Sequence, residues 1–173
     1  MNEQSESTYV VRPATSDDAE FIALMTLEAF NWDPARTPFT MAQLLADPAL
    51  AKYVEGWPAA GEQGVVAWAS DPISGSPARV GAAWWRYFSA AEPGYGYVAD
   101  DVPEIGIAVV ASWRGRGLGR ALLRGIADRA RAAGLTRLSL SVERPNPAAR
   151  LYAAEGYDVV VGDDNADTRA KRL

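Results

Sequence analysis

The chain has 173 residues, a net charge of −5 at neutral pH and 49% hydrophobic residues, a length and composition that predict one domain with an ordinary buried core. It contains no cysteine and no histidine, which excludes a disulfide framework, a thiol nucleophile, a thiolate metal site and any imidazole base. Its chemistry therefore has to use carboxylates, tyrosines, backbone dipoles or a cofactor.

The chain carries no recognisable membrane or export signal. No apolar run reaches the ~20 residues that cross a bilayer, and the polar, acidic start at 1–7 is unlike a signal peptide. We expect residues 1–7 to be a disordered tail and the protein to be cytoplasmic, without a membrane partner. Its alanine content and its preference for arginine over lysine are typical of a GC-rich bacterial genome.

Apolar periodicity and turn residues predict a strand-rich middle with helices at both ends, an α/β chain. A Ser16 cap opens the first helix, and Asp47-Pro48 ends the second. In chain order, the predicted elements are a strand at 9–13, helices at 16–30 and 41–49, strands at 64–69, 80–87 and 105–111, a long helix that stops at Gly134, a strand at 136–142, a short helix at 147–155 and a last strand near the C-terminus.

Arginine is concentrated in one part of this acidic chain. The segment 112–150 holds nine arginines and two acidic residues, a local charge of +7, whereas 1–111 carries −10 and 151–173 carries −2. A basic segment in an acidic protein indicates an anionic partner. The pI of about 4.8 argues against nucleic acid as that partner.

The basic segment contains a glycine loop, Arg-Gly-Arg-Gly-Leu-Gly at 114–119, between the apolar strand at 105–111 and the long helix. Free N–H groups and the positive end of the helix dipole make such a turn an anion site, and glycine lets a phosphate approach the backbone. The loop lacks the Gly-Lys-Ser/Thr of a nucleotide P-loop and the spacing of a dinucleotide fingerprint. The alternative is a glycine-rich turn in which Arg120, Arg124 and Arg131 belong to a solvated helix face.

The loop resembles the acetyl-CoA signature Arg/Gln-x-x-Gly-x-Gly/Ala of the GNAT superfamily of N-acetyltransferases, matched by Arg114, Gly117 and Gly119. The run 146–157 resembles the second family element, with Asn, Ala three residues on, Tyr three further, and then Gly and an aromatic. The resemblance covers about residues 8–173. It implies the GNAT fold in a single domain, a strongly twisted mixed sheet whose fourth and fifth strands splay apart, flanked by helices, with acetyl-CoA as co-substrate and no metal.

The resemblance also implies the cofactor contacts. Asn146 has a structural alternative, because Asn before Pro147 is a common N-cap and N1 pair, and Arg114 either contacts phosphate or caps the turn. A backbone N–H at Val109 or a neighbour would stabilise the oxyanion. The implied contacts are Ile107, Ala108, Val109, Arg114, Gly115, Arg116, Gly117, Leu118, Gly119, Arg120 and Asn146.

Two residues are candidates for catalysis. An acceptor amine is mostly protonated at neutral pH, and without histidine a carboxylate is the natural base. Glu104 lies where many GNAT enzymes place that glutamate, although a solvated or substrate-binding carboxylate is the alternative. Tyr152 occupies the family position of the acid that protonates the leaving thiolate, with a core tyrosine as the alternative. Asp100 and Asp101 either add negative potential or belong to a polar loop.

The expected acceptor site is formed by Asn31, Trp32, Trp84 and Glu104. Aromatic side chains with carboxylates suit a cation or a flat hydrophobic amine. Trp84 and Trp85 must face opposite sides of a strand, so at least one belongs to the core, and packing is an alternative for Tyr87, Tyr95 and Tyr97 as well.

Two functions stay open. The first is an acetyl-CoA-dependent N-acetyltransferase acting by direct attack in a ternary complex on a small-molecule or peptide amine, in a monomer or homodimer. The second is a non-catalytic acyl-CoA-binding module or sensor. The sequence does not identify the acceptor.

Overall fold

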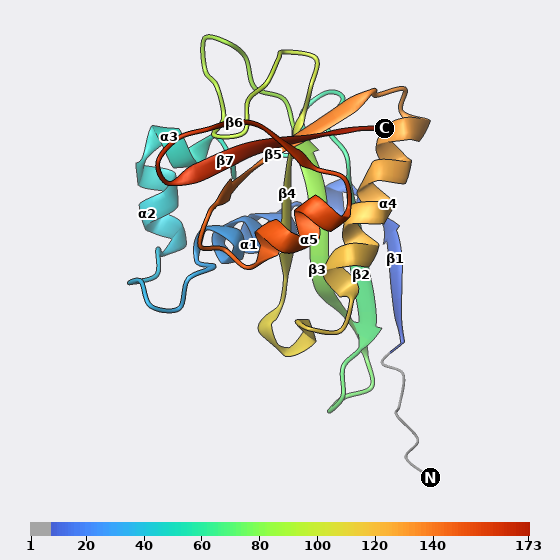
Figure 1. The fold of residues 1–173 in the computed structure, drawn as a ribbon. Helices are drawn as coiled ribbons and strands as arrows, with labels where there is room; N and C mark the ends of the chain where they lie inside the picture. The colour runs from blue at the N-terminus through green and yellow to red at the C-terminus, as the bar shows by residue number, and fades with distance from the viewer. Residues whose placement is uncertain (1–7) are drawn as a thin grey trace.

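The computed structural model describes residues 8–173, which form a seven-stranded mixed sheet with helices on both faces (Figure 1). The expectation of a disordered tail at 1–7 lies outside the described residues. The strand order is β1-β2-β3-β4-β5-β7-β6. The strands are β1 (Tyr9–Pro13), β2 (Gly64–Ser70), β3 (Pro77–Arg86), β4 (Glu104–Val109), β5 (Arg137–Glu143), β6 (Asp158–Gly162) and β7 (Ala166–Arg172). The helices are α1 (Ala19–Phe30), α2 (Met41–Ala46), α3 (Pro48–Ala51), α4 (Leu118–Ala132) and α5 (Ala148–Ala154), with 3₁₀ turns η1 (Ser16–Asp18) and η2 (Ala111–Trp113).

The first four strands form an antiparallel half-sheet. The β2–β3 hairpin turns where the sequence predicts it, because the Asp71 carboxylate accepts the backbone N–H groups of Ile73 and Ser74 at 3.0 and 2.7 Å. Gly75 completes the turn with a φ of 69°, a conformation that glycine adopts without steric cost.

The β4 and β5 strands separate soon after they meet. Their parallel pairing is limited to Glu104 and Ser139, where the Ser139 N–H donates to the carbonyl of Pro103 at 3.0 Å. The rest of β5 pairs on its other side with β7. This is the splay that the family resemblance implies, and it leaves one edge of β4 without a neighbouring strand.

Each face of the sheet has its own core. On the α4 face, Leu122 and Ile126 of the helix pack with Trp85; on the α1 face, Ile22 packs with Trp84. Trp84 is 3% exposed and Trp85 is 0% exposed. The predicted alternation is therefore confirmed, and both side chains belong to the core. The α4 helix ends beside Gly134, which has a φ of 80°, at the predicted stop.

Three element predictions were wrong. Ser16 is not a cap but the first residue of η1, whose N-cap is Thr15. The helix expected at 41–49 is broken into α2 and α3, because Asp47 leaves the helical conformation as residues before proline do. The expected last strand is a hairpin of β6 and β7, whose turn forms when the Asp163 carboxylate accepts the N–H groups of Asn165 and Ala166 at 2.7 and 2.8 Å. Within 8–173, none of the helices combines the length and the apolar composition that a bilayer crossing requires.

Candidate active site

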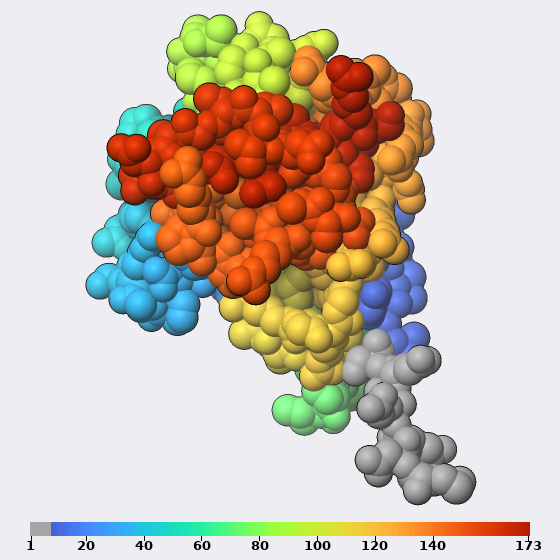
Figure 2. Space-filling model, viewed as in Figure 1, coloured from blue at the N-terminus to red at the C-terminus, as the bar shows by residue number. Residues whose placement is uncertain are grey.

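A cavity of about 1100 Å³ lies where β4 and β5 diverge. Its wall includes β4, the end of β5, the glycine loop and the start of α5. In Figure 2 it opens as a hollow between the orange surface of α5 and the yellow surface of the loop, with olive atoms of β4 at its bottom. The chain therefore brings both of its sequence motifs to one space.

The glycine loop presents backbone to this cavity. Gly115 and Gly117 have φ angles of 72° and 80°, and Gly117 is the N-cap of the 15-residue helix α4 without any side-chain cap. A Cβ at either position would meet nothing within 4 Å, so the loop surface is open. The unsatisfied N–H groups and the dipole of α4 make this end of the helix suited to a phosphate.

The arginine side chains of the loop and of the first turn of α4 bond to other groups of the protein. Arg114 donates to the Val109 carbonyl at 3.1 Å and pairs with Glu28 of α1 at 2.5 Å, so the side chain fastens the turn to β4 and α1. Arg120 pairs with Glu155 at 3.4 Å. Both line the cavity, as do Gly115, Gly117, Leu118 and Gly119. Arg116, stacked over Trp113 at 5.0 Å, is the predicted cofactor residue that does not line it.

The unpaired edge of β4 supplies backbone donors. Ile107, Ala108 and Val109, three of the predicted cofactor contacts, line the cavity. The Val110 N–H donates to Val80 of β3 at 3.0 Å, and N–H groups alternate between the two sides of a strand. The N–H groups of Ile107 and Val109 therefore face the side from which β5 has departed.

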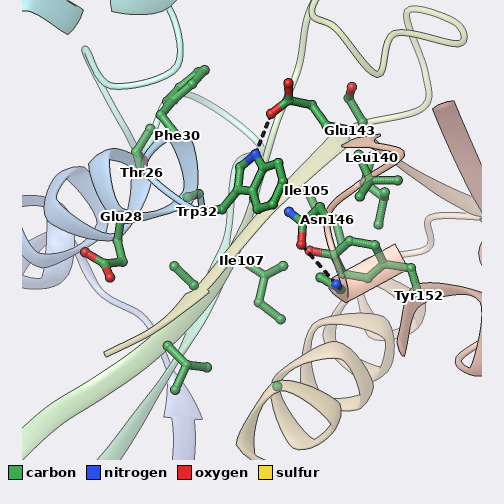
Figure 3. A pocket seen from close by; sticks show the side chains of 18 of the residues that line it. Thr26, Glu28, Phe30, Trp32, Ile105, Ile107, Leu140, Glu143, Asn146 and Tyr152 are labelled. Atoms are coloured by element: carbon green, nitrogen blue, oxygen red, sulfur yellow. Dashed lines mark hydrogen bonds between the residues drawn. The ribbon is translucent and has the colours of Figure 1, made fainter. Parts of the chain in front are cut away.

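Tyr152 points into the cavity from α5, towards Asn146 (Figure 3). Burial raises the pKa of its hydroxyl to about 12, so this phenol keeps its proton at physiological pH. The fully buried core tyrosine is its neighbour Tyr157, whose ring lies 6.4 Å away. Asn146 also lines the cavity, and its side chain accepts the Ala148 N–H at 2.9 Å, so it has the capping role.

Glu104 lies at the start of β4, 6% exposed, in the wall of the same cavity. Its Oε1 accepts the Tyr53 hydroxyl at 3.1 Å, whereas its buried Oε2 has no hydrogen-bond partner among the described residues. Burial raises the pKa of this carboxyl to about 7, against the opposing effects of the Gly96 backbone, Tyr53 and Lys52. The solvated-carboxylate alternative is therefore wrong for Glu104.

Not all of the predicted acceptor residues line the cavity. Trp32 lines the cavity, and Trp84 contributes to its wall from the core. Asn31 does not line the cavity. Its side chain closes the loop after α1 by donating to the Phe39 carbonyl at 3.0 Å and accepting the Phe39 N–H at 2.8 Å.

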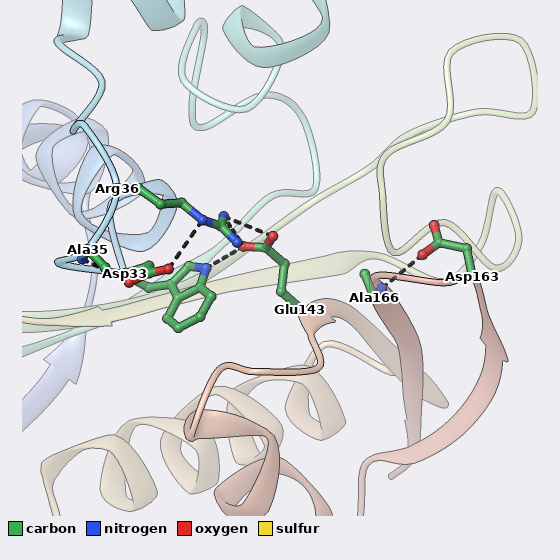
Figure 4. Close-up of polar contacts among 7 residues, drawn as sticks. Asp33, Ala35, Arg36, Glu143, Asp163 and Ala166 are labelled. Atoms are coloured by element: carbon green, nitrogen blue, oxygen red, sulfur yellow. Dashed lines mark hydrogen bonds and ion pairs between the residues drawn. The ribbon is translucent and has the colours of Figure 1, made fainter.

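Sequence reasoning missed a link across the cavity mouth. The Trp32 indole N–H donates to Glu143 at the end of β5 (Figure 3), and Arg36 pairs with the same carboxylate at 2.9 Å (Figure 4). Arg36 also pairs with Asp33 at 3.2 Å and lies over the Trp32 ring. The two contacts to Glu143 join residues more than 100 positions apart, and no local pattern predicts them.

Sequence reasoning also missed three aromatic rings that line the same cavity as Glu104. They belong to Phe30, Tyr53 and Phe88. For Asp100 and Asp101, the sequence left added negative potential and a polar loop as equal alternatives. The Tyr97 hydroxyl donates to Asp100 at 2.6 Å, and neither Asp100 nor Asp101 lines the cavity. The only available signal for the missed rings was aromatic content in short elements, which cannot specify their meeting place.

Comparisons with known proteins agree with this geometry. A sequence model of the acetyltransferase (GNAT) family matches residues 21–157, so the chain belongs to the GNAT acetyltransferase family. Comparison with curated proteins gave no significant match.

Solved structures share the fold at low sequence identity. The PaiA N-acetyltransferase of Thermoplasma acidophilum in complex with coenzyme A is 14% identical with a TM-score of 0.66, covering 96% of this chain and 99% of that one. YncA of Salmonella typhimurium, a putative acetyltransferase with acetyl-CoA, is 19% identical with a TM-score of 0.62, covering 95% and 94%. A GCN5-related N-acetyltransferase from Kribbella flavida is 20% identical with a TM-score of 0.64, covering 98% and 100%.

Proposed function

We propose that this protein transfers the acetyl group of acetyl-CoA to a primary amine by direct attack within a ternary complex. The observation that carries the proposal is the shared cavity, whose wall contains the open glycine loop, the free edge of β4, the phenol of Tyr152 and the buried carboxylate of Glu104. Acetyl transfer to an amine needs a phosphate cradle, an oxyanion donor, a proton donor and a base, and these groups supply one each.

The loop and β4 fit acetyl-CoA. The open faces of Gly115 and Gly117 and the N-terminus of α4 would hold the phosphates through backbone N–H groups. The free edge of β4 offers backbone partners to the amides of the pantetheine arm, and the N–H of Val109 or Ile107 is the oxyanion donor. When bound, acetyl-CoA supplies an activated acetyl thioester. Two of the similar structures contain coenzyme A or acetyl-CoA, which supports this choice.

Glu104 acts as the base. An ammonium with a pKa of ~10.4 must lose a proton before its nitrogen can attack. A carboxyl whose pKa is about 7 is a better proton acceptor than an ordinary glutamate and is still largely ionised at slightly alkaline pH. It therefore takes the proton from the bound acceptor, and the nitrogen then forms its bond to the acetyl carbon as the carbon–sulfur bond breaks.

Tyr152 meets the departing sulfur. A free thiol has a pKa of ~8.5, and the Tyr152 hydroxyl, with a pKa of about 12, remains protonated and can donate a hydrogen bond or a proton to the thiolate. The attacking nitrogen then loses its second proton, which returns to Tyr152, so that a neutral amide, a free thiol and a protonated Tyr152 remain.

The test is acetyl-CoA-dependent thiol release over a panel of amines, with acetylated product identified by mass. Tyr152→Phe is expected to lower turnover by about 100-fold or more with acetyl-CoA affinity within about twofold. Tyr87→Phe is the matched control, because Tyr87 lies outside the cavity wall. Stoichiometric acetyl-CoA binding without thiol release for every amine would favour the acyl-CoA sensor instead.

A further inference from the structure

The part of the cavity beside Glu104 is walled by aromatic rings. Tyr53 is central to them: its ring centroid lies 5.7 Å from Phe30, 4.9 Å from Phe88 and 5.8 Å from Tyr95. Phe30 ends α1, Tyr53 lies in the turn after α3, and Phe88 and Tyr95 lie on the loop between β3 and β4; all four line the cavity. Flat apolar walls of this kind bind a flat apolar group.

No basic side chain among residues 8–173 forms an ion pair with Glu104, although the charge of Lys52 lowers the pKa of its carboxyl. Arg86 is its register partner on β3, but the Arg86 guanidinium is turned to Glu62 at 3.2 Å and to the carbonyls of Lys52 and Glu55 at 3.0 and 2.6 Å. Lys52 in turn donates to the Pro93 carbonyl at 2.6 Å. The Glu104 carboxylate, in the cavity wall and without an ion-pair partner among the described residues, is therefore the group that can meet a cation brought by a ligand.

The other acidic residues of the cavity wall are already engaged. Glu28 pairs with Arg114, and Glu143 with Arg36. Asp163 accepts two backbone N–H groups in the β6–β7 turn. The aromatic end of the cavity thus offers one anionic contact, which suits a single positive charge and leaves the further charges of a polyamine without partners.

We propose, on the basis of the function proposed above, that the acceptor is a primary amine with one positive charge and a flat apolar group, of the phenylalkylamine class. Its ring packs against the cavity side of Phe30, Tyr53, Phe88 and Tyr95, and its ammonium donates to the Glu104 carboxylate. Bound in this way, the ammonium lies against the group that takes its proton.

Direct binding tests this assignment. Calorimetric titrations into the protein saturated with CoA would compare 2-phenylethylamine with spermidine, ethanolamine and the uncharged 2-phenylethanol. We expect 2-phenylethylamine to bind at least about tenfold more tightly than the other three, since it alone uses both the rings and the carboxylate. Tighter binding of spermidine or ethanolamine would overturn the proposal.

Variants separate the two contacts. Glu104→Gln is expected to weaken 2-phenylethylamine by about tenfold or more and to leave 2-phenylethanol within about twofold. Phe88→Leu is expected to weaken both ligands, and Phe21→Leu, outside the cavity wall, neither. Equal affinities of wild type and both site variants for 2-phenylethylamine would contradict the proposed site.

The outcomes also separate this proposal from the proposed function. Acetylation of other amines, with no measurable binding of 2-phenylethylamine, would overturn the acceptor class and leave the transferase intact. Absence of acetyl-CoA binding would overturn the transferase itself.

Discussion

Glu104→Gln tests whether a carboxylate is held in this cavity at a cost in stability. Burial raises the pKa of Glu104 from 4.5 to about 7, so the folded protein holds a proton there that the unfolded chain has released. The contribution of Glu104 to the stability of the folded state therefore becomes unfavourable as the pH rises from 4.5 through 7. At about 1.4 kcal/mol per pKa unit, the loss reaches about 3 kcal/mol above pH 8. Glutamine keeps an acceptor for Tyr53 and cannot ionise.

Urea unfolding of the wild type and Glu104→Gln from pH 4.5 to 8.5 measures this loss. Across this pH range, the free energy of unfolding of the variant is expected to rise by about 3 kcal/mol relative to that of the wild type. This corresponds to about 6–12 °C in melting temperature. The chain has no histidine or cysteine, so few other groups titrate between pH 5.5 and 8.5. Glu92→Gln, on the loop after β3 and exposed, is the charge-matched control. Parallel profiles for wild type and Glu104→Gln would refute the reasoning.

Three further experiments have specific expected results. Gly117→Ala and Gly134→Ala both place alanine at a φ of 80° in open space, and each should lower the free energy of unfolding by about 1 kcal/mol. Only Gly117→Ala should weaken acetyl-CoA binding, by about tenfold or more in calorimetry. Equal affinities of the two variants for acetyl-CoA would argue against a phosphate site at the glycine loop. Glu155→Ala removes a carboxylate that binds Arg124 at 3.0 and 3.2 Å and should cost about 2 kcal/mol in urea unfolding, whereas Asp128→Ala, in an exposed pair, should cost under about 0.5; similar costs would contradict the ranking. The kcat/KM of wild type should rise with pH through about 7 as Glu104 ionises, and a rate profile with this limb unchanged in Glu104→Gln would exclude Glu104 as the base.

Local sequence signals predicted the parts of the fold that local chemistry determines. The helix stop at Gly134, the hairpin turn at Asp71 and the opposite faces of Trp84 and Trp85 follow from backbone conformation, side-chain capping and strand alternation. The break at Asp47 was also present in the sequence, because the residue before proline disfavours helix, but the helix was expected to end there rather than resume.

The acceptor end of the site depends on tertiary contacts, which a sequence read locally does not contain. Tyr53 reaches Glu104 from 51 positions away, and Trp32 reaches Glu143 from 111. Asn31 was expected at the acceptor site because it closes the first helix, where the family resemblance places the substrate entrance, but its amide pairs with Phe39 in a short loop. Side chains that satisfy local backbone groups are therefore poor candidates for ligand contacts.

Thermal unfolding with and without acetyl-CoA tests most directly whether the glycine loop is a working cofactor cradle. At ~100 times its Kd, acetyl-CoA should stabilise the folded protein by about 2.7 kcal/mol, which for a chain of this size raises the melting temperature by about 5–10 °C. An unchanged melting temperature at millimolar acetyl-CoA would contradict the cradle, and with it the roles assigned to Glu104 and Tyr152.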